Sequence, residues 1–385
     1  MFRYKCLNPI AQIGLNGFSK DYIQADAADA AELVLVRSAK MHDMELGSET
    51  VAVARAGAGV NNIPLDKYAQ QGIVVFNTPG ANANGVKELF LFAALAGVRD
   101  VIGGIKWAES EFGNPDIAAL AEKEKKRFAG HEIMGKTLGV LGLGAIGVKV
   151  ANMAVTLGMK VVGYDPYLSE ASKATLDSMV KVTDDLNVIA AESELITIHV
   201  PAMASTIGMI NADFLSKCRK GVIVINLARD TLVNEPDMQA ALSLGQVGKY
   251  ICDFPTPGAA QMKNAIIIPH LGASTEESED NCAVMAVQQL VDFMENGNIK
   301  NSVNYPPVDA GRADGVVRVC VNHKSSVKGA DIAAAVTAAG ADVKGFAGKE
   351  KGEFAYTLVD VAAYVDGLED KIAGDGILKI RVINR

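Results

Sequence analysis

A glycine-rich turn between apolar segments is the feature that most constrains what this chain can fold into. Residues 136–141 form a short apolar run, and Gly142, Gly144 and Gly147 follow it with the spacing G-x-G-x-x-G. An amphipathic run and a second apolar run come next, and the acidic residue Asp165 closes the pattern. Strand, tight turn, helix, strand and acid in this order predict a dinucleotide-binding unit in a parallel α/β sheet.

Each position in this turn has a physical reason. Gly142 allows the tight turn, Gly144 lets the backbone approach a pyrophosphate, and Gly147 lets helix and strand pack closely. The N–H groups that begin the helix attract phosphates, and the carboxylate of Asp165 would bind ribose hydroxyls but repel a 2′-phosphate, which favours NAD over NADP. The predicted cofactor contacts in this segment are Gly142, Gly144, Ala145, Ile146, Gly147 and Asp165. The alternative is a structural strand-to-helix turn without a ligand.

Composition excludes several classes of protein. The chain has 385 residues, which suggests two or three domains, and its net charge of −8 gives no reason to expect nucleic acid or an anionic membrane as a partner. No run of apolar residues is long enough for a membrane span, and the N-terminus resembles a first strand rather than a signal peptide. Five scattered cysteines without metal-ligand spacing predict free thiols, no metal site and a cytoplasmic location.

The order of apolar runs predicts three parts. Short strand-like runs alternate with helix-like runs, which indicates two doubly wound parallel-sheet (Rossmann-like) domains of the α/β class. A long helix over residues 83–110 and another over 274–296 would connect them. The predicted domains are a discontinuous substrate-binding domain (1–95 and 276–305), a nucleotide-binding domain (96–275), a linker (306–315) and a C-terminal ferredoxin-like domain with βαββαβ order (316–385).

These motifs together resemble the D-isomer-specific 2-hydroxyacid dehydrogenases, and the tail resembles an ACT domain. The segments that carry the resemblance are Val36-Arg37-Ser38, Arg55 to Ile63, the glycine turn with Gly163-Tyr164-Asp165-Pro166, His199-Val200-Pro201, Asn226 to Arg229, Pro269 to Ser274, and Glu353 to Asp360. The resemblance implies an NAD-dependent oxidoreductase that moves a hydride to or from a small 2-hydroxy acid. It also implies a homo-oligomer, a dimer or tetramer, that associates through its nucleotide domain.

The resemblance assigns roles to individual residues. Arg229 would clamp the substrate carboxylate and carbonyl, and His270 would be the acid/base that exchanges a proton with the hydroxyl. Arg37 and Arg55 would bind a phosphate on the substrate, which is therefore expected to be a phosphorylated hydroxy acid. Backbone N–H groups at Gly57 and Ala58 would hold its α-carboxylate. The further cofactor contacts implied are Val200, Pro201, Leu227, Ala228, Asp253, Gly272 and Ala273. His199 is interpreted as a core histidine or as one that supports a neighbouring site residue.

The chain departs from the family pattern at two places. Most relatives carry a glutamate that orients the catalytic histidine, but residues 252–257 here read Cys-Asp-Phe-Pro-Thr-Pro and contain none. The partner of His270 is then absent, is Asp253 itself, or is a group that the sequence does not place. The loop at residues 322–329 lacks the proline of an ACT ligand site, so feedback by serine and a purely structural tail are both open. Alternative functions are a dehydrogenase for glycerate or glyoxylate, or a nucleotide-sensing regulator with reduced catalysis.

Overall fold

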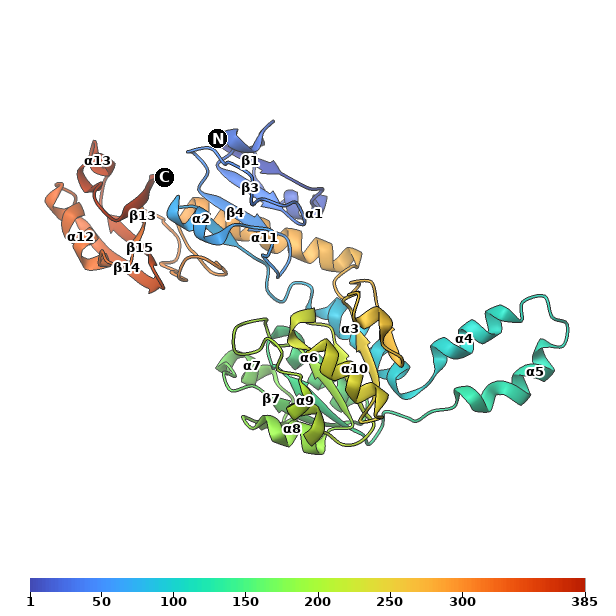
Figure 1. Ribbon diagram of the computed structural model, residues 1–385. Helices are drawn as coiled ribbons and strands as arrows, with labels where there is room; N and C mark the ends of the chain where they lie inside the picture. The colour runs from blue at the N-terminus through green and yellow to red at the C-terminus, as the bar shows by residue number, and fades with distance from the viewer. Residues whose placement is uncertain (385) are drawn as a thin grey trace. The chain divides into compact units, whose positions relative to one another are not determined.

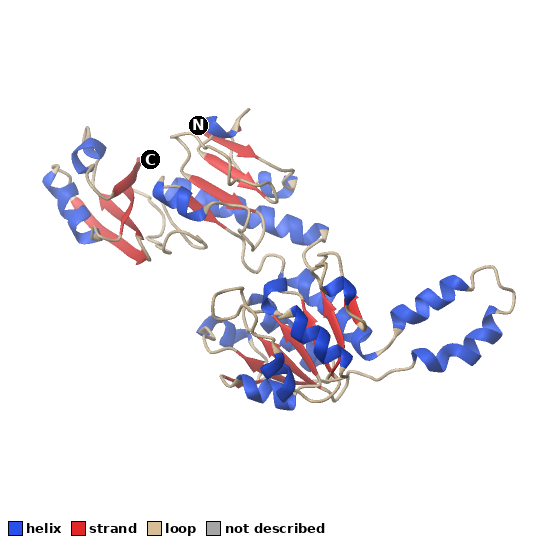
Figure 2. Ribbon diagram, viewed as in Figure 1, coloured by secondary structure: helices blue, strands red, loops and turns tan. Residues whose placement is uncertain are grey.

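The computed structural model describes residues 1–384 and divides the chain into two compact units. One unit contains Met1–Asn82 together with the chain from Glu276 onward, and the other is Ala83–Thr275. Figure 1 shows the elements in chain order and Figure 2 their type. Each unit is organised around a parallel sheet, and the first also carries an antiparallel sheet at its C-terminal end.

The N-terminal part of the first unit is a five-stranded parallel sheet in the order β2-β1-β3-β4-β5. The strands are β1 (Phe2–Cys6), β2 (Tyr22–Gln24), β3 (Leu33–Val36), β4 (Ala52–Arg55) and β5 (Val74–Phe76). The helices are α1 (Gln12–Leu15), α2 (Leu65–Gln70) and the long α11 (Glu276–Asn296). The central strands β3 and β4 are apolar along almost their whole length because both faces of a parallel sheet are covered. The edge strand β2 has only three residues, of which only Tyr22 is buried.

The second unit contains a seven-stranded parallel sheet in the order β12-β11-β10-β9-β6-β7-β8. The strands are β6 (Thr137–Leu141), β7 (Lys160–Tyr164), β8 (Lys181–Thr183), β9 (Leu195–Ile198), β10 (Val222–Asn226), β11 (Val247–Cys252) and β12 (Ala265–Ile267). The helices are α3 (Ala83–Val98), α6 (Ala145–Thr156), α7 (Glu170–Thr175), α8 (Leu186–Glu192), α9 (Ala212–Lys217) and α10 (Glu235–Ser243). The strand order reverses at β6 and β9, and ligands of such sheets bind at the carboxyl ends beside this point.

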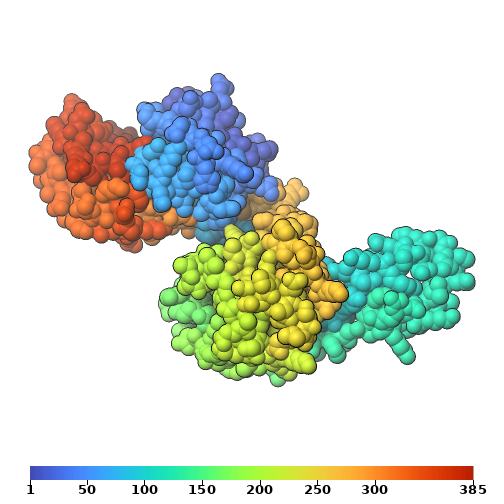
Figure 3. All heavy atoms as spheres, in the orientation of Figure 1, coloured from blue at the N-terminus to red at the C-terminus, as the bar shows by residue number. Residues whose placement is uncertain are grey.

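The long helix predicted over residues 83–110 is interrupted. α3 ends at Val98, and α4 (Val101–Ser110) begins after Asp100, whose side chain accepts a hydrogen bond from the Gly103 N–H at 3.2 Å. An aspartate that caps a new helix N-terminus competes with continuation of the preceding helix, which the uninterrupted apolar pattern did not reveal. α4 and α5 (Ile117–Glu124) contain no buried residue, and Figures 1 and 3 show them as an arm that stands clear of the sheet in this unit.

The C-terminal part is a four-stranded antiparallel sheet in the order β14-β15-β13-β16, the ferredoxin-like arrangement predicted from the βαββαβ order. Its elements are β13 (Val317–Lys324), α12 (Gly329–Ala338), β14 (Val343–Lys351), β15 (Phe354–Val361), α13 (Leu368–Ile372) and β16 (Ile377–Asn384). The sequence pattern predicts a helix over residues 361–373 in this part of the chain, but α13 has only five residues. The strand β15 uses Val361 in its ladder to β13, and Gly367 precedes α13 in a left-handed conformation.

The C-terminal sheet shares a hydrophobic core with the N-terminal sheet. Phe76, Phe293, Tyr356 and Leu358 belong to one buried cluster, although they come from both sheets and from α11. Arg318 lies at the centre of the junction and is only 1% exposed. Its guanidinium donates to Asp360 at 2.7 and 2.9 Å and also to the carbonyl oxygens of Asn296, Gly311 and Ala310.

Candidate functional site

The predicted residues of the second unit are brought together by strand register. Ile267, Cys252, Asn226, Ile198, Leu141 and Tyr164 are paired in one row across six neighbouring strands. All the strands are parallel, so the residues that follow this row leave the sheet at the same edge. Counted from β12 to β7, the edge therefore carries His270, Asp253, Arg229, Val200 with Pro201, Gly142 and Asp165.

The glycine turn has the close approaches that the motif requires. Gly142 has a φ of +92°, and a Cβ there would lie 2.9 Å from the His199 backbone. A Cβ on Gly147 would lie 1.8 Å from the carbonyl oxygen of Gly142, so only glycine lets α6 start so close to the turn. A Cβ on Gly144, by contrast, would meet no protein atom within 4 Å. Nothing in the chain itself requires a glycine at residue 144.

The open space at Gly144 fits a dinucleotide. Gly144 precedes α6, no side chain caps the helix, and both Gly144 and Ala145 are exposed. The first N–H groups of a helix need an external partner, and phosphate oxygens supply one. Ile146 is half-buried and packs against the core of this unit, so its contribution to a cofactor site would come from its backbone.

Asp165 connects the end of β7 to the glycine turn. Its carboxylate accepts the backbone N–H of Leu143 at 2.9 Å and that of Tyr167 at 2.9 Å, one on each oxygen. Each carboxylate oxygen has a second lone pair, so the group can still accept hydroxyl donors from a ribose. The sequence does not reveal this structural role, because it shows only that an acidic residue follows the second apolar run.

Asp253 anchors the loop that contains His270. The carboxylate is 1% exposed and accepts the backbone N–H groups of Leu271 and Gly272, both at 2.7 Å. Burial raises the pKa of Asp253, and these two hydrogen bonds and the nearby His270 oppose the shift. His270 itself is exposed, has a φ of +57° and packs its ring against Phe254 with centroids 5.1 Å apart. Asp253 therefore holds the histidine loop through the backbone.

Arg229 lies beyond the end of β10 with its side chain exposed. Asn226 fixes this turn, because its amide nitrogen donates to the Arg229 carbonyl at 2.8 Å and its oxygen accepts from the Ala228 N–H at 3.1 Å. The Arg229 guanidinium donates to the Ala228 carbonyl at 2.5 Å and makes no ion pair within residues 1–384. The other nitrogens of its fork are available to an anion.

The other predicted cofactor contacts differ in how they face the edge. Val200 lies beside Gly142, and Pro201 is exposed. The side chain of Leu227 is buried in the core, so only its backbone could contact a ligand, whereas Ala228 is half-buried. Gly272 is buried, and a Cβ there would lie 2.9 Å from the Asp253 carboxylate, so glycine lets the loop close on its anchor. Ala273 is half-buried beside it.

His199 is a structural histidine. Its Nε2 lies 2.9 Å from the Thr197 hydroxyl, and its Nδ1 is shielded from solvent. Burial lowers the pKa of His199 to about 3, so the imidazole is neutral at physiological pH. The sequence interpretation of a core histidine agrees with this environment.

The predicted substrate residues of the first unit occupy two adjacent strand ends. Arg55 is the last residue of β4 and pairs with Val36, and Arg37 is the residue after Val36. A Cβ on Gly57 would lie 2.3 Å from an Arg55 guanidinium nitrogen, so glycine lets the arginine lie across this loop. The Gly57 N–H donates to the buried Thr78 hydroxyl at 2.7 Å. Ala58 is half-buried, and its carbonyl accepts from Asn77 at 2.6 Å.

Arg37 is held at both its backbone and its guanidinium. The Asn8 side-chain oxygen accepts the backbone N–H groups of Arg37, Ser38 and Ala39 at 2.9 to 3.0 Å. The guanidinium pairs with the carboxylate of Glu279 in α11 at 2.5 Å. Neither partner was singled out by sequence reasoning, because both contacts join residues that are distant along the chain.

A third group connects the two arginines. Cys282 of α11 is 5% exposed, and its thiol is hydrogen-bonded by the Thr78 side chain. Burial raises the pKa of Cys282, while the positive charges of Arg55 and Arg37 act in the opposite direction and Glu279 adds to the increase. Both arginines and Glu279 are therefore close to one thiol.

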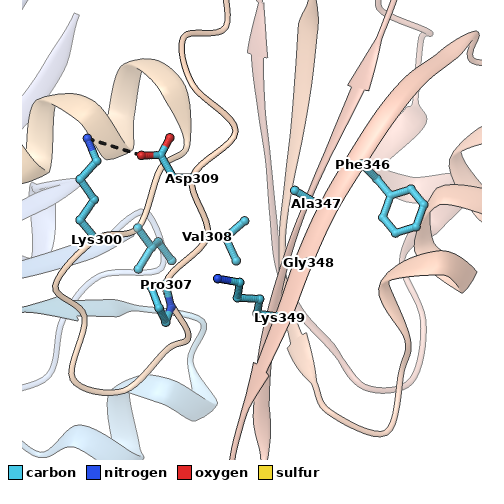
Figure 4. A pocket seen from close by; sticks show the side chains of 9 residues that line it. Lys300, Pro307, Val308, Asp309, Phe346, Ala347, Gly348 and Lys349 are labelled. Atoms are coloured by element: carbon cyan, nitrogen blue, oxygen red, sulfur yellow. Dashed lines mark ion pairs between the residues drawn. The ribbon is translucent and has the colours of Figure 1, made fainter. Parts of the chain in front are cut away.

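Two grooves in the C-terminal part lie away from all these residues. One, of about 570 Å³, runs between the segment that follows α11 and the edge strand β14. In Figure 4, Lys300 and Asp309 face each other and Lys349 points toward Pro307, whereas Phe346 lies on the other side of the strand. The other groove, of about 410 Å³, is lined by His323, Thr357 and neighbouring residues of α12 and β14.

Comparison with known proteins identifies the second unit. Residues 93–272 match the family model described as "D-isomer specific 2-hydroxyacid dehydrogenase, NAD binding domain". The D-3-phosphoglycerate dehydrogenases of Archaeoglobus fulgidus and Homo sapiens are 33% and 32% identical to this chain over 72% and 74% of its length. A crystal structure of NAD+-bound 3-phosphoglycerate dehydrogenase from Entamoeba histolytica aligns with a TM-score of 0.62 and 26% identity, covering 79% of this chain and 98% of that one.

The chain belongs to the D-isomer-specific 2-hydroxyacid dehydrogenase family. The match with its NAD-binding domain contains every predicted residue from the glycine turn to Gly272. The chain spans about half the length of the curated relatives it matches, 52% and 53% for the two named above.

Membrane-spanning helices and metal clusters are both absent from the described part of the chain. No helix within residues 1–384 is long and apolar enough to cross a membrane. Over the same residues, no group of three or more His, Cys, Asp or Glu side chains could hold a metal ion.

Proposed function

We propose that the chain catalyses the NAD-dependent oxidation of D-3-phosphoglycerate to 3-phosphohydroxypyruvate, the first step of L-serine biosynthesis. The observation that carries this proposal is the pair of arginines, Arg37 and Arg55, at adjacent strand ends beside one buried thiol. Two guanidinium groups in this arrangement suit a phosphate dianion, because each fork can donate two hydrogen bonds to it. The names of the relatives support the same substrate.

The proposed chemistry assigns one task to each residue at the edge of the second unit. Bound NAD supplies the hydride acceptor. His270 removes the hydroxyl proton during oxidation and returns it during reduction, which suits an imidazole near neutral pH. Arg229 stabilises negative charge on the oxygen and holds the α-carboxylate. Asp253 keeps the His270 loop in place. The Gly57 N–H already donates to Thr78, so the backbone donor proposed for the substrate is that of Ala58.

The experiment measures NADH consumption with 3-phosphohydroxypyruvate, hydroxypyruvate and glyoxylate. We expect the phosphorylated substrate to give the highest kcat/KM. Arg55→Ala should raise its KM at least about tenfold and change kcat less, because a charge-assisted hydrogen bond contributes about 1.5–3 kcal/mol. Arg219→Ala is the control. Arg219 comes before the start of β10, whereas Arg229 follows the other end of this strand. An equal loss with hydroxypyruvate would contradict the phosphate assignment.

We also propose a homo-oligomer, a dimer or tetramer, formed through the arm that carries α4 and α5. The side chains of Val101, Ile105 and Phe112 are exposed there, and neither helix buries a residue. An amphipathic helix pair without a core of its own gains stability from a second copy. The five cysteines are free thiols, which supports a cytoplasmic location.

A further inference from the structure

Glu279 pairs its carboxylate with Arg37, a residue that the proposed function assigns to binding of the substrate phosphate. Its carboxylate lies 2.5 Å from the Arg37 guanidinium, and both side chains are 42% exposed. An arginine whose fork already holds a carboxylate has fewer donors left for a second anion. A phosphate that approaches Arg37 would also be repelled by this carboxylate.

The ion pair is placed so that it can open. Half-exposed partners gain little from a surface salt bridge, so separating them costs little free energy. Glu279 lies in the first turn of α11 together with Glu276 and Glu277, where the helix dipole favours a negative charge even when its partner is lost. The backbone of Arg37 is fixed independently, because Asn8 binds the N–H groups of three successive residues. Arg37 therefore does not need Glu279 to keep its place at the end of β3.

We infer that Glu279 is a specificity-determining residue, a resident anion that the substrate phosphate displaces from Arg37. This inference rests on the proposed function. Arg55 alone would attract any anion, whereas a ligand that also engages Arg37 must carry enough charge to compete with a carboxylate. Glu279 thus lowers the affinity of the site for a group that must displace it from Arg37, such as the substrate phosphate, and has little effect on a ligand that does not engage Arg37.

The test is the substitution Glu279→Gln, which keeps a hydrogen-bond acceptor for Arg37 and removes only the charge. We expect KM for 3-phosphohydroxypyruvate to fall roughly threefold to tenfold, from the loss of one repulsive charge a few ångströms away. KM for hydroxypyruvate, which lacks the phosphate, should change less than twofold. Glu277→Gln, at an exposed position of the same helix, is the matched control and should change neither value.

The same variants separate this inference from a simple positioning role. In an Arg37→Gln background, Glu279→Gln should have no further effect, because the competition needs the guanidinium. An unchanged or higher KM for 3-phosphohydroxypyruvate in Glu279→Gln would overturn the inference, since it would mean that the carboxylate only orients Arg37.

A binding measurement tests the inference even if the proposed function is wrong. If the wild-type chain does not consume NADH when 3-phosphohydroxypyruvate is added, the proposed function fails. Binding of inorganic phosphate to the full chain, measured by isothermal titration calorimetry, then still tests Glu279. Tighter binding by Glu279→Gln than by the wild type supports a resident anion, and equal binding overturns it.

Discussion

Single residues at this site have two tasks, one in the fold and one toward a ligand. Asp165 ties β7 to the glycine turn and keeps lone pairs for a ribose, and Asp253 uses both carboxylate oxygens on the loop of His270. The family pattern would place a glutamate near the histidine, and this chain has none in residues 252–257. Asp253 instead holds the loop of His270 through the backbone N–H groups of Leu271 and Gly272.

The substitution Asp253→Asn tests this anchor. Asparagine offers one acceptor oxygen, so its NH2 group would face one of the two backbone N–H donors and leave it unsatisfied at a cost of about 1–3 kcal/mol. We expect a lower melting temperature and a loss of kcat of at least about tenfold. Asp213→Asn, at an exposed position of α9, is the control. An unchanged acidic limb of the pH–rate profile would rule out Asp253 as the charge partner of His270.

At the scale of an element, the start of α6 combines two glycines with different constraints. Gly147 is required by the fold, because a Cβ there would overlap the Gly142 carbonyl. Gly144 has open space around it and a φ of −74°, which any residue can adopt. A glycine that the chain does not need is explained by a ligand that approaches the backbone.

The pair Gly144→Ala and Gly147→Ala separates these constraints. We expect Gly144→Ala to keep the wild-type melting temperature but to weaken NADH binding about tenfold, because the methyl group occupies the space for a pyrophosphate. Gly147→Ala should lose both stability, by about 1–3 kcal/mol as in overpacked cores, and NADH binding. Calorimetric unfolding and fluorescence titration with NADH measure the two effects. Equal NADH affinity in Gly144→Ala and the wild type would contradict the assignment.

At the scale of the whole molecule, Arg318 joins the C-terminal sheet to the rest of its unit. Its guanidinium satisfies Asp360 and three carbonyl groups, one of them at the end of α11. A second arginine, Arg381, donates to the carbonyls of Met294 and Phe293, and the Tyr356 hydroxyl donates to Gly297. Cationic donors at the C-terminus of a helix complement its dipole. α11 thus links the C-terminal sheet to the residues around Arg37.

The variant Arg318→Met should loosen this junction. Removing the guanidinium leaves a carboxylate and three carbonyls without their partner, so we expect a loss of about 3–5 kcal/mol of unfolding free energy. Arg312→Met is the control, because Arg312 pairs with Asp314 on the surface and should cost less than about 1 kcal/mol. Denaturant unfolding and limited proteolysis of residues 306–315 measure the effect. Equal stability of the two variants would show that the junction depends on the apolar core alone.

The sequence alone determined the glycine turn, the parallel sheets and the ferredoxin-like order of the tail, because these follow from short-range spacing and alternation. The apolar pattern did not reveal the break after Val98, because there the Asp100 cap starts a new helix. It also predicted too long a helix at α13, because Val361 is part of the ladder between β15 and β13. Only the tertiary structure decided what Asp253, Arg37 and Gly144 face. Those environments join Asp253 to Gly272 and Arg37 to Glu279, contacts between residues far apart in the chain that no local pattern encodes.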